Sequence, residues 1–500
     1  MGCSCYAMAG PCHGPDTLPP TGQTRNGRMH FIACGVSFDV ASNELNTRWT
    51  ALWIPSGSTS LIDTAHKNDN KKVASMSSDS TALNLESAYS AVSDMYKGAD
   101  LDIHALCREM RHRSPVYEGD FIAQFGVPTN AGMQAGTRPT FALFKYKDVM
   151  AVLRDGASFT SGFIAEGLGA FFDGLIILAM DGEQHRKVRA LLQPAFMPET
   201  VNKWRDKIDR VIREHFLLPM VADKRADLMD FGLNFPIREM YALMGFPEDD
   251  PQTYRQYAAW ALAMVGGNQI DPVKAPEARR LAGIAVKALY DEILKVVIQR
   301  RADGSGGDDL IGRLLRAEHE GRQLDDHEVT TFVRSLLPAA GETTTRTFSS
   351  ALVLLLSTPG LLERVRADRS LIGKLIDESV RYEPVATFKV REAARDVEID
   401  GVKIPKGAFV QCMVVSANRD EDAFDNPDQF DIDRKPKPSF GFGFGPHMCI
   451  GQFVAKVELN CAINAILDLF PNVRFDPSRP QPVITGAQLR GASSLPVIWD

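Results

Sequence analysis

Residues 442–451 read FGFGPHMCIG, and this stretch decides how the rest of the chain is interpreted. Cys449 lies in a glycine-rich loop, and a helical pattern over 452–469 begins directly after it. A thiolate that binds a metal must be deprotonated, and backbone N–H groups that point at the sulfur stabilise its negative charge. The N-terminal end of the following helix favours the same anion, and glycines permit the tight backbone path. The loop therefore predicts a metal-binding thiolate at Cys449, with an ordinary buried cysteine in a glycine-rich turn as the alternative.

Each fixed position of this stretch matches F-G-x-G-x-H/R-x-C-x-G, the haem-ligand loop of the cytochrome P-450 superfamily of haem-thiolate monooxygenases. The resemblance spans residues 101–500 and implies a mainly α fold with a minor β-sheet component, a triangular helical prism with a long distal helix over the haem. It also implies haem b (iron protoporphyrin IX), with Cys449 as the axial ligand of its iron. By the same resemblance His447 donates to a haem propionate, Phe442 packs beside the sulfur, and Gly451 belongs to the cofactor-binding loop. A thiolate axial ligand pushes electron density onto iron, which favours cleavage of the O–O bond.

Glu378 and Arg381 are three residues apart, a spacing that places them on one face of a helix. Taken alone, the pair is explained equally well by a solvated helical salt bridge. Ahead of the thiolate loop, it resembles the structural E-x-x-R of the same family. The third partner in that family is an arginine of the following meander, but Gln429 stands at this position, which leaves Arg434 or Arg419 as the substitute.

A long helix is predicted over residues 326–357, where apolar side chains recur at helical spacing. Asp325 and Asp326 suit its N-terminal cap, and Pro359 with Gly360 stops the run. Pro338 is expected to kink this helix.

Residues 339–344 of this helix read AAGETT. Glu342 and Thr343 resemble the acid–alcohol pair of the family, which implies that both are catalytic residues that deliver protons from solvent. The alternative is a plain helix whose threonine hydroxyls bond to carbonyls four residues earlier. Ala340 stands where the family commonly has glycine.

His185 and Arg189 are four residues apart on one predicted helix face. Resemblance to the family makes them, together with Arg391, binding partners of the haem propionates. Without that resemblance, basic residues on a helix are simply solvated.

The substrate pocket implied by the resemblance draws on several segments and is mostly apolar, which suits a hydrophobic ligand. Its expected residues are Phe163, Phe171, Phe172, Leu336, Ala339, Val385 and Phe388. Each is equally compatible with an ordinary core position. Lys389 either meets a carboxylate or extends its charged end outward to solvent.

Composition describes the remainder of the chain. Residues 1–97 are polar and rich in Ser, Asn, Gly and Thr, and we expect a disordered or loosely packed extension ahead of a catalytic domain over 98–500. The net charge of −7 gives no attraction to nucleic acid. No apolar run approaches 18 residues and no secretory signal is visible, so we expect a cytoplasmic protein without a membrane span.

No flavin- or nicotinamide-binding glycine fingerprint follows a predicted strand, and no Cys₄ iron–sulfur spacing is present. We therefore expect electrons from a separate ferredoxin with its reductase, used with dioxygen to hydroxylate a small hydrophobic substrate. Four basic residues near the cysteine loop are either a docking surface for this acidic partner or plain surface charge: Arg186, Lys187, Lys435 and Lys437. Two other interpretations remain, a haem-thiolate enzyme that uses peroxides or does not oxygenate, and a non-catalytic haem sensor or carrier.

Overall fold

The computed structural model describes residues 83–128, 138–167, 176–246, 251–304 and 307–500, together with the backbone of two strands, β1 (Arg28–Ala33) and β2 (Val36–Ala41). The chain forms two compact units, Met1–Ala74 and Ser75–Asp500. In the first unit, β1 and β2 pair in antiparallel fashion, with Arg28 opposite Ala41. All predicted site residues belong to the second unit.

The second unit includes helix α2 (Leu85–Lys97), so it begins upstream of the boundary at residue 98 that the composition suggested. The side chain of Asn84 caps this helix and accepts a hydrogen bond from the Ser87 backbone N–H at 2.7 Å. The buried side chains of α2 recur at helical spacing and join the main core: Leu85, Tyr89, Val92, Met95 and Tyr96. This amphipathic face binds α2 to the core, in contrast to the loosely packed extension expected over residues 1–97.

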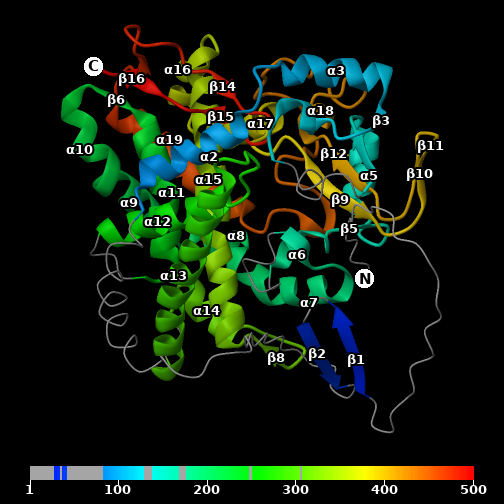
Figure 1. Cartoon of the computed structure of the whole chain (residues 1–500). Helices are drawn as coiled ribbons and strands as arrows, with labels where there is room; N and C mark the ends of the chain where they lie inside the picture. The colour runs from blue at the N-terminus through cyan, green and yellow to red at the C-terminus, as the bar shows by residue number, and fades with distance from the viewer. Residues whose placement is uncertain are drawn as a thin grey trace. The chain divides into compact units, whose positions relative to one another are not determined.

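The second unit is mainly helical, as predicted. Its longer helices are α3 (Ile103–Arg113), α5 (Tyr146–Arg154), α7 (Gly182–Leu192), α11 (Leu228–Met244), α12 (Pro251–Gly266), α13 (Ala275–Ala302), α15 (Asp326–Ser357), α17 (Leu371–Tyr382) and α19 (Gln452–Leu469). Its shorter helices are α6 (Ile164–Gly167), α8 (Pro198–Asn202), α9 (Arg205–Val211), α10 (Leu218–Met220), α14 (Leu310–Arg316), α16 (Leu361–Ala367) and α18 (Val414–Ala417). Figure 1 shows α11, α12, α13 and α14 gathered around α15, which contacts all four.

Helix α15 has the bounds that the sequence predicts. Asp325 and Glu328 form a reciprocal capping box at its start, in which each side chain accepts a hydrogen bond from the other residue's backbone N–H. The helix continues through Pro338 and is buried over most of its length. Among the described helices none is by itself long and apolar enough to cross a membrane. Helices α15 and α16 are long and apolar enough only when they are taken together, and the two are bent by 105° relative to each other.

The minor β component centres on a five-stranded sheet in the order β3 (Val116–Glu118), β4 (Thr140–Leu143), β12 (Phe409–Cys412), β9 (Lys389–Ala393) and β5 (Phe159–Thr160). β12 pairs with β4 in parallel and with β9 in antiparallel fashion. The remaining strands form short pairs or triplets: β6 (Arg225–Asp227), β7 (Glu318–His319), β8 (Arg322–Gln323), β10 (Val397–Ile399), β11 (Val402–Ile404), β13 (Arg474–Phe475), β14 (Ile484–Thr485), β15 (Gly491–Ala492) and β16 (Pro496–Ile498).

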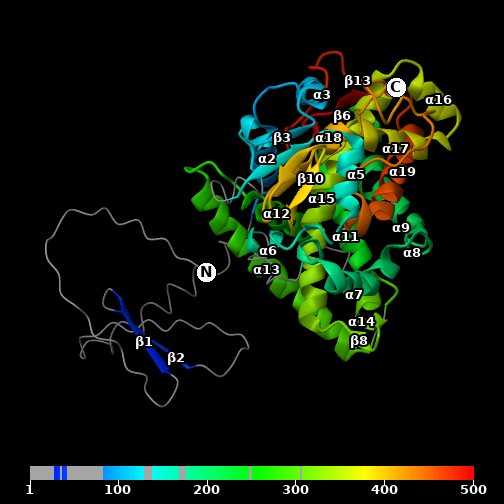
Figure 2. The same ribbon diagram turned by 90° about the vertical axis from the view of Figure 1, so that its right-hand side faces the viewer.

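Successive side chains of this sheet alternate between two cores. Leu143 and Val410 pack with residues of α5, whereas Ala142 and Phe409 pack with residues of α3. In Figure 2, α5 and α18 lie beside the sheet. The sheet thereby fixes β9, which carries Arg391, relative to the helical part of the unit.

Candidate active site

The loop that carries Cys449 is held by backbone hydrogen bonds and two glycines in left-handed conformations. The Cys449 N–H donates to the Phe442 carbonyl at 2.7 Å, which closes the loop on itself. Gly443 has φ +77° and Gly445 φ +69°. A Cβ on Gly445 would lie 2.3 Å from the Leu153 carbonyl oxygen at the end of α5, so this position accepts no side chain.

Cys449 stands just before α19, whose N-terminal cap residue is Gly451. It is exposed, whereas the other described cysteines, Cys107, Cys412 and Cys461, are buried. Protein on the remaining sides raises the pKa of the Cys449 thiol by desolvation. Hydrogen bonding by the backbone N–H of Gly451 and the nearby charges of Lys389 and Arg189 act in the opposite direction. The sulfur is therefore reachable and surrounded by groups that favour its thiolate form.

His185 and Arg189 of α7, Arg391 of β9 and His447 form a basic cluster close to this sulfur. The rings of His185 and His447 lie 4.2 Å apart between centroids. Burial, followed by the charges of His447 and Arg189, lowers the pKa of His185 to about 4. Burial likewise lowers the pKa of Arg391 and of Arg189. Several basic groups are thus crowded together, and bound anions would favour the charged forms of these groups.

Little in the protein neutralises this basic cluster. His185 Nε2 is buried and has no hydrogen-bond partner within the described ranges of the chain. Arg391 donates to the backbone carbonyl of Val390 at 2.8 Å. Asp181 approaches His447 at 3.6 Å, but its carboxylate also accepts hydrogen bonds from the Ser161 and Gly162 backbone N–H groups.

These residues fit haem on the chemistry of their donors. The cluster offers cationic partners for two propionate carboxylates, and Cys449 offers one soft metal ligand. Among the described residues, no group of three or more His, Cys, Asp or Glu side chains is arranged to hold a metal ion. A single protein ligand suits a metal whose other ligands come from a porphyrin.

Glu378 and Arg381 form the predicted pair on α17. Arg381 donates to both Glu378 oxygens at 2.7 Å, and both side chains are buried. Arg381 also donates to the carbonyls of Asn418 and Pro427. Arg434 is the third partner, with its Nε 3.2 Å from Glu378. This network joins α17 to the segment that leads into the Cys449 loop.

Arg419, the other candidate for that third partner, belongs to a second buried network that the sequence did not reveal. Its guanidinium lies 3.7 Å from the centre of the Tyr382 ring and donates to Glu383 at 2.8 Å. Glu383 also binds Arg490 and His104. Burial raises the pKa of Glu383, but Arg490 and His104 outweigh it and hold the pKa well below its usual range. In the sequence, this network is marked only by Glu383-Pro384 after the E-x-x-R helix. That pair carries no information about the distant partners of Glu383.

On α15, Thr343 is exposed, as is Ala339 one turn earlier, although the helix is otherwise largely buried. The Thr343 hydroxyl donates to the Ala339 carbonyl at 2.8 Å, the bond expected of a plain helix. Glu342 is buried and accepts a hydrogen bond from Arg346 Nε at 2.6 Å. The middle of α15 thus presents an alcohol to solvent and keeps the acid inside.

The expected pocket residues do not form one cluster. Phe163 and Phe388 are buried in the core near Phe409, whereas Leu336 is buried in the main core. Ala339 and Val385 are at least partly accessible. Phe171 and Phe172 lie outside the described residues.

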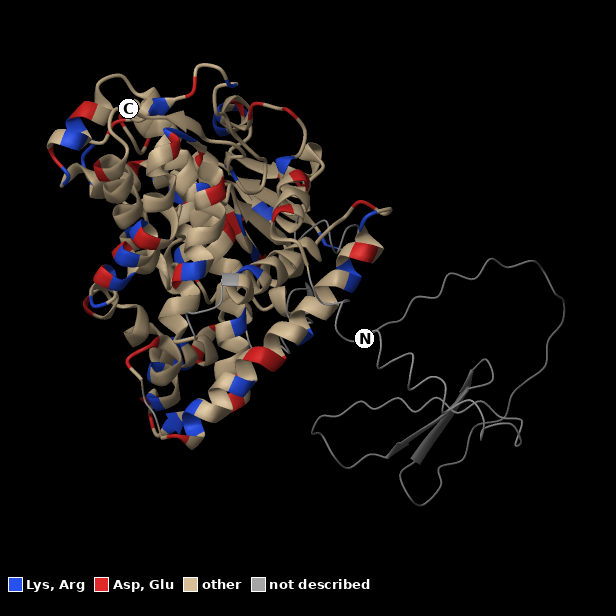
Figure 3. Ribbon diagram, turned by 90° about the vertical axis from the view of Figure 1, so that its left-hand side faces the viewer, with Lys and Arg blue, Asp and Glu red and all other residues tan. Residues whose placement is uncertain are grey.

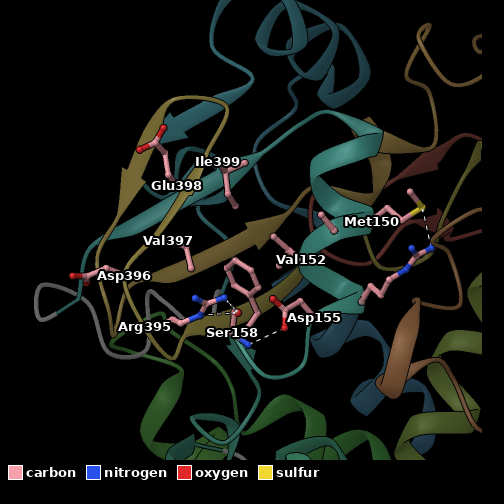
Figure 4. A pocket seen from close by; sticks show the side chains of 12 residues that line it. Met150, Val152, Asp155, Ser158, Arg395, Asp396, Val397, Glu398 and Ile399 are labelled. Carbon is pink, nitrogen blue, oxygen red and sulfur yellow. Dashed lines mark hydrogen bonds between the residues drawn. The ribbon is translucent and has the colours of Figure 1, made fainter.

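A hollow of about 630 Å³ lies elsewhere, between α5 and the β10–β11 hairpin (Figure 4). Arg154, Ser158 and Arg395 are among its lining residues, and Arg395 donates to the Ser158 hydroxyl. None of the expected pocket residues lines this hollow. It adjoins the cysteine loop through Arg154, whose guanidinium lies 5.4 Å from the centre of the Phe444 ring.

The four basic residues considered for docking show a mixed pattern. Lys187 pairs with Glu183 at 3.1 Å and Glu320 at 3.2 Å, and Arg186 approaches Glu183 at 3.7 Å. Lys437 lies 5.1 Å from the centre of the Tyr146 ring. In Figure 3, basic and acidic residues are interspersed over the described part of the chain.

Comparisons with known proteins agree with this geometry. The family model for cytochrome P450 matches residues 268–493. Cyclomarin C epoxidase of Salinispora arenicola is 32% identical over 380 residues, which cover 74% of this chain and 89% of the epoxidase. Erythromycin C-12 hydroxylase of Saccharopolyspora erythraea is 33% identical over 337 residues, or 67% of this chain and 83% of the hydroxylase.

Solved structures give the same result. The crystal structure of CYP109E1 from Bacillus megaterium in complex with testosterone superimposes with a TM-score of 0.68 at 26% identity, covering 80% of this chain and all of that one. The match to relatives of which nearly nine-tenths is covered, together with the cysteine loop and the helical fold, shows that this chain belongs to the cytochrome P450 family.

Proposed function

We propose that this protein is a cytoplasmic enzyme that takes two electrons from a separate ferredoxin and its reductase and hydroxylates a small hydrophobic molecule with dioxygen. The coarser activity follows from the family: relatives named as an epoxidase and a hydroxylase identify a cytochrome P450 monooxygenase, whose standard cofactor is haem b. When bound, haem supplies the iron centre at which dioxygen is activated. The observation that carries the proposal is the accessible thiol of Cys449 at the start of α19, beside a basic cluster.

In this proposal Cys449 would hold the haem iron through its thiolate. Backbone N–H groups at the start of α19 stabilise its thiolate, and the partial positive charge of the helix end adds to this effect. Phe442 and Gly451 flank the sulfur within the loop. His185, Arg189, Arg391 and His447 would bind the two propionates, because these basic side chains gather near the sulfur.

Glu342 and Thr343 move protons to the distal side of the site. Thr343 is accessible, so its hydroxyl oxygen accepts a hydrogen bond from water while its own proton is bound to the Ala339 carbonyl. Rotation of this hydroxyl releases the proton for donation toward the reacting atoms. Glu342 exchanges protons with solvent from a buried position one residue earlier.

The carbon monoxide difference spectrum of the reduced holoenzyme tests this assignment. A thiolate-ligated haem gives a red-shifted Soret band, and we expect this band in the wild type and its loss in Cys449→Ser. Cys461→Ser is the matched control, because Cys461 is a buried cysteine within α19 and does not belong to the Cys449 loop. A wild-type spectrum typical of histidine ligation, or a red-shifted band that persists in Cys449→Ser, would contradict the proposal.

The substrate class rests on what relatives bind and on two accessible residues of the expected pocket. One structural neighbour was solved with testosterone, and another was solved with an acyl carrier protein that carries hexadec-9Z-enoic acid. We propose that Ala339 and Val385 contact a hydrophobic substrate here too. A Soret-shift titration with testosterone and hexadec-9Z-enoic acid checks this class. A shift that is weakened by Ala339→Phe supports it, whereas binding of polar compounds alone contradicts it.

The electron donor is tested by reversing charge near the cysteine loop. Lys187→Glu with Lys437→Glu is expected to weaken turnover with a surrogate ferredoxin and to flatten its salt dependence, because steering by opposite charges falls with ionic strength. Lys287→Glu, on α13, is the control. Unchanged turnover and salt dependence in the double variant would remove the docking assignment.

A further inference from the structure

A buried ion pair on α15 fixes one oxygen of Glu342. Arg346 follows Glu342 by one helical turn, and its Nε and Nη2 both lie 2.6 Å from Glu342 Oε1. The two side chains are only 5% and 2% exposed. Glu342 Oε2 is also buried and has no hydrogen-bond partner among the described residues. Arg346 therefore clamps one oxygen of the carboxylate, and the other oxygen has no such contact.

Arg346 connects this pair to two elements that are distant in sequence. Its Nη2 donates to the Ser93 hydroxyl of α2 at 3.2 Å, and its Nη1 donates to the Leu489 carbonyl at 3.4 Å, between β14 and β15. The guanidinium carbon lies 5.9 Å from the centre of the Tyr89 ring, also on α2. Helix α2, the middle of α15 and the β14–β15 hairpin therefore meet at one side chain.

A glycine on the β14–β15 hairpin makes room for the Arg346 side chain. A Cβ on Gly491 would lie 2.9 Å from Arg346 Cβ and Cγ, so a glycine is required where the β14–β15 hairpin passes α15. The hairpin in turn holds α2, because the Ala487 N–H donates to the carbonyls of Tyr96 and Lys97. The Ala492 N–H donates to the Ser349 hydroxyl of α15 at 3.0 Å.

A buried ion pair contributes little net stability, because desolvation of both charges offsets their attraction. The pair does, however, fix the geometry of its two side chains. The burial of Arg346 lowers its pKa, but the adjacent carboxylate of Glu342 outweighs this effect and raises it, so the guanidinium stays charged. A permanently charged donor on one oxygen gives the carboxylate a single orientation.

We infer that Arg346 is a positioning residue for proton delivery, which holds Glu342 through Oε1 and makes α2 part of this machinery through Ser93. The inference rests on the proposed role of Glu342 in proton transfer. It adds that the acid is oriented by its own helix and by α2, which contributes Ser93 from 253 residues earlier in the chain than Arg346.

Variants of the holoenzyme test this inference without knowledge of the substrate. The measurement is NADPH-driven oxygen consumption with a surrogate ferredoxin and its reductase in H₂O and D₂O. Reduction of dioxygen to hydrogen peroxide, to water or with hydroxylation of a substrate consumes protons in each case. Arg346→Gln is expected to slow consumption by roughly tenfold and to enlarge the solvent isotope effect. This is less than the roughly 10²–10⁴-fold that a positioned acid or base itself contributes, because Arg346 orients the acid and does not replace it. Arg346→Lys keeps the charge and is expected to restore most of the rate.

Arg334→Gln is the matched control, a buried arginine earlier on α15 that donates to the Val286 carbonyl. It is expected to keep the wild-type isotope effect. An unchanged isotope effect in Arg346→Gln, or an equal change in Arg334→Gln, overturns the inference when the red-shifted carbon monoxide band is intact. Loss of that band from the wild type is instead a failure of the proposed function.

Hydrogen exchange of the holoenzyme supplies a readout that does not depend on turnover. Arg346→Gln and Ser93→Ala are both expected to speed amide exchange in Leu85–Lys97 while α13 stays protected. If Ser93→Ala leaves both the exchange of α2 and the isotope effect at wild-type values, the participation of α2 is refuted.

Discussion

The imidazole rings of His185 and His447 lie 4.2 Å apart, although the first belongs to α7 and the second to the loop before α19. Neither residue is near the other in sequence, so the tertiary fold alone brings them together. Burial lowers the pKa of His185 to about 4, and the nearby positive charges of His447 and Arg189 act in the same direction. An anionic group bound beside His185 would favour its protonated form, so we predict that His185 contributes to cofactor retention.

Replacement of His185 by leucine is expected to weaken haem retention by roughly tenfold to a hundredfold, the effect of losing one hydrogen bond to a charged group. The measurement is the rate of haem transfer from the holoenzyme to an excess of an apo-acceptor protein. Arg186→Leu, at the exposed neighbouring position, serves as the control. Equal transfer rates in both variants would show that His185 has no role in binding the cofactor.

Removal of Arg381 leaves Glu378 buried without its main partner and the Asn418 and Pro427 carbonyls without a donor. Arg381→Ala is expected to lower the free energy of unfolding by about 3–5 kcal/mol, as measured by chemical denaturation. Arg280→Ala breaks an exposed pair with Glu277 at the same spacing and should cost about 0–1 kcal/mol. A loss for Arg381→Ala no larger than this control would contradict the structural role of the network.

Gly445→Ala tests the cysteine loop. The residue has φ +69°, and a Cβ would meet the Leu153 carbonyl oxygen at 2.3 Å, so the loop must shift away from α5. We expect a lower haem content after purification and a weaker red-shifted band per mole of protein. Gly373→Ala, at a helical position on α17 where a Cβ meets nothing within 4 Å, should leave both quantities unchanged.

Glu458 gives the protein a dependence of stability on pH. It is buried on α19, and burial raises the pKa of its carboxyl from 4.5 to about 8. Burial penalises the ionised form of this carboxyl, so the folded state is free of that penalty only while the carboxyl stays protonated. Stability is therefore lost as the pH rises from about 4.5 to about 8, by up to roughly 5 kcal/mol, and is constant above that window.

The isosteric variant Glu458→Gln removes this titration. Denaturant unfolding of both proteins across the same window should show the wild type losing stability relative to the variant. Parallel curves for the two proteins would mean that Glu458 is not neutral when folded.

The sequence predicted helix bounds and the cysteine loop well where local signals were strong. The bounds of α15 and α19 follow from apolar periodicity, and for α15 also from Asp325 at its start and from Pro359 and Gly360 just beyond its end. The cysteine loop is confirmed as a glycine-dependent turn. In these segments the residues that determine the structure are neighbours in the chain.

Other features depend on tertiary contacts that no local pattern carries. The sequence left Arg434 and Arg419 as equal candidates to join Glu378, and only the path of the meander assigns Arg434 to Glu378 and Arg419 to Glu383. Phe163 and Phe388 are buried in a core around Phe409. Their pocket role stays a prediction, because an apolar side chain that faces a ligand and one that faces the core give the same sequence signal. Helix α2 was missed, since its apolar positions are diluted by serines.

The parallel pairing of β12 with β4 has a consequence for how the enzyme is made. Phe409–Cys412 lies beside Thr140–Leu143, so the centre of the sheet cannot close on the ribosome until β12 has been synthesised, long after β4. Cys449 is synthesised later still. Until β12 emerges, β4 presents an open edge to the nascent chain, and a cofactor held through Cys449 would enter after this sheet is able to close.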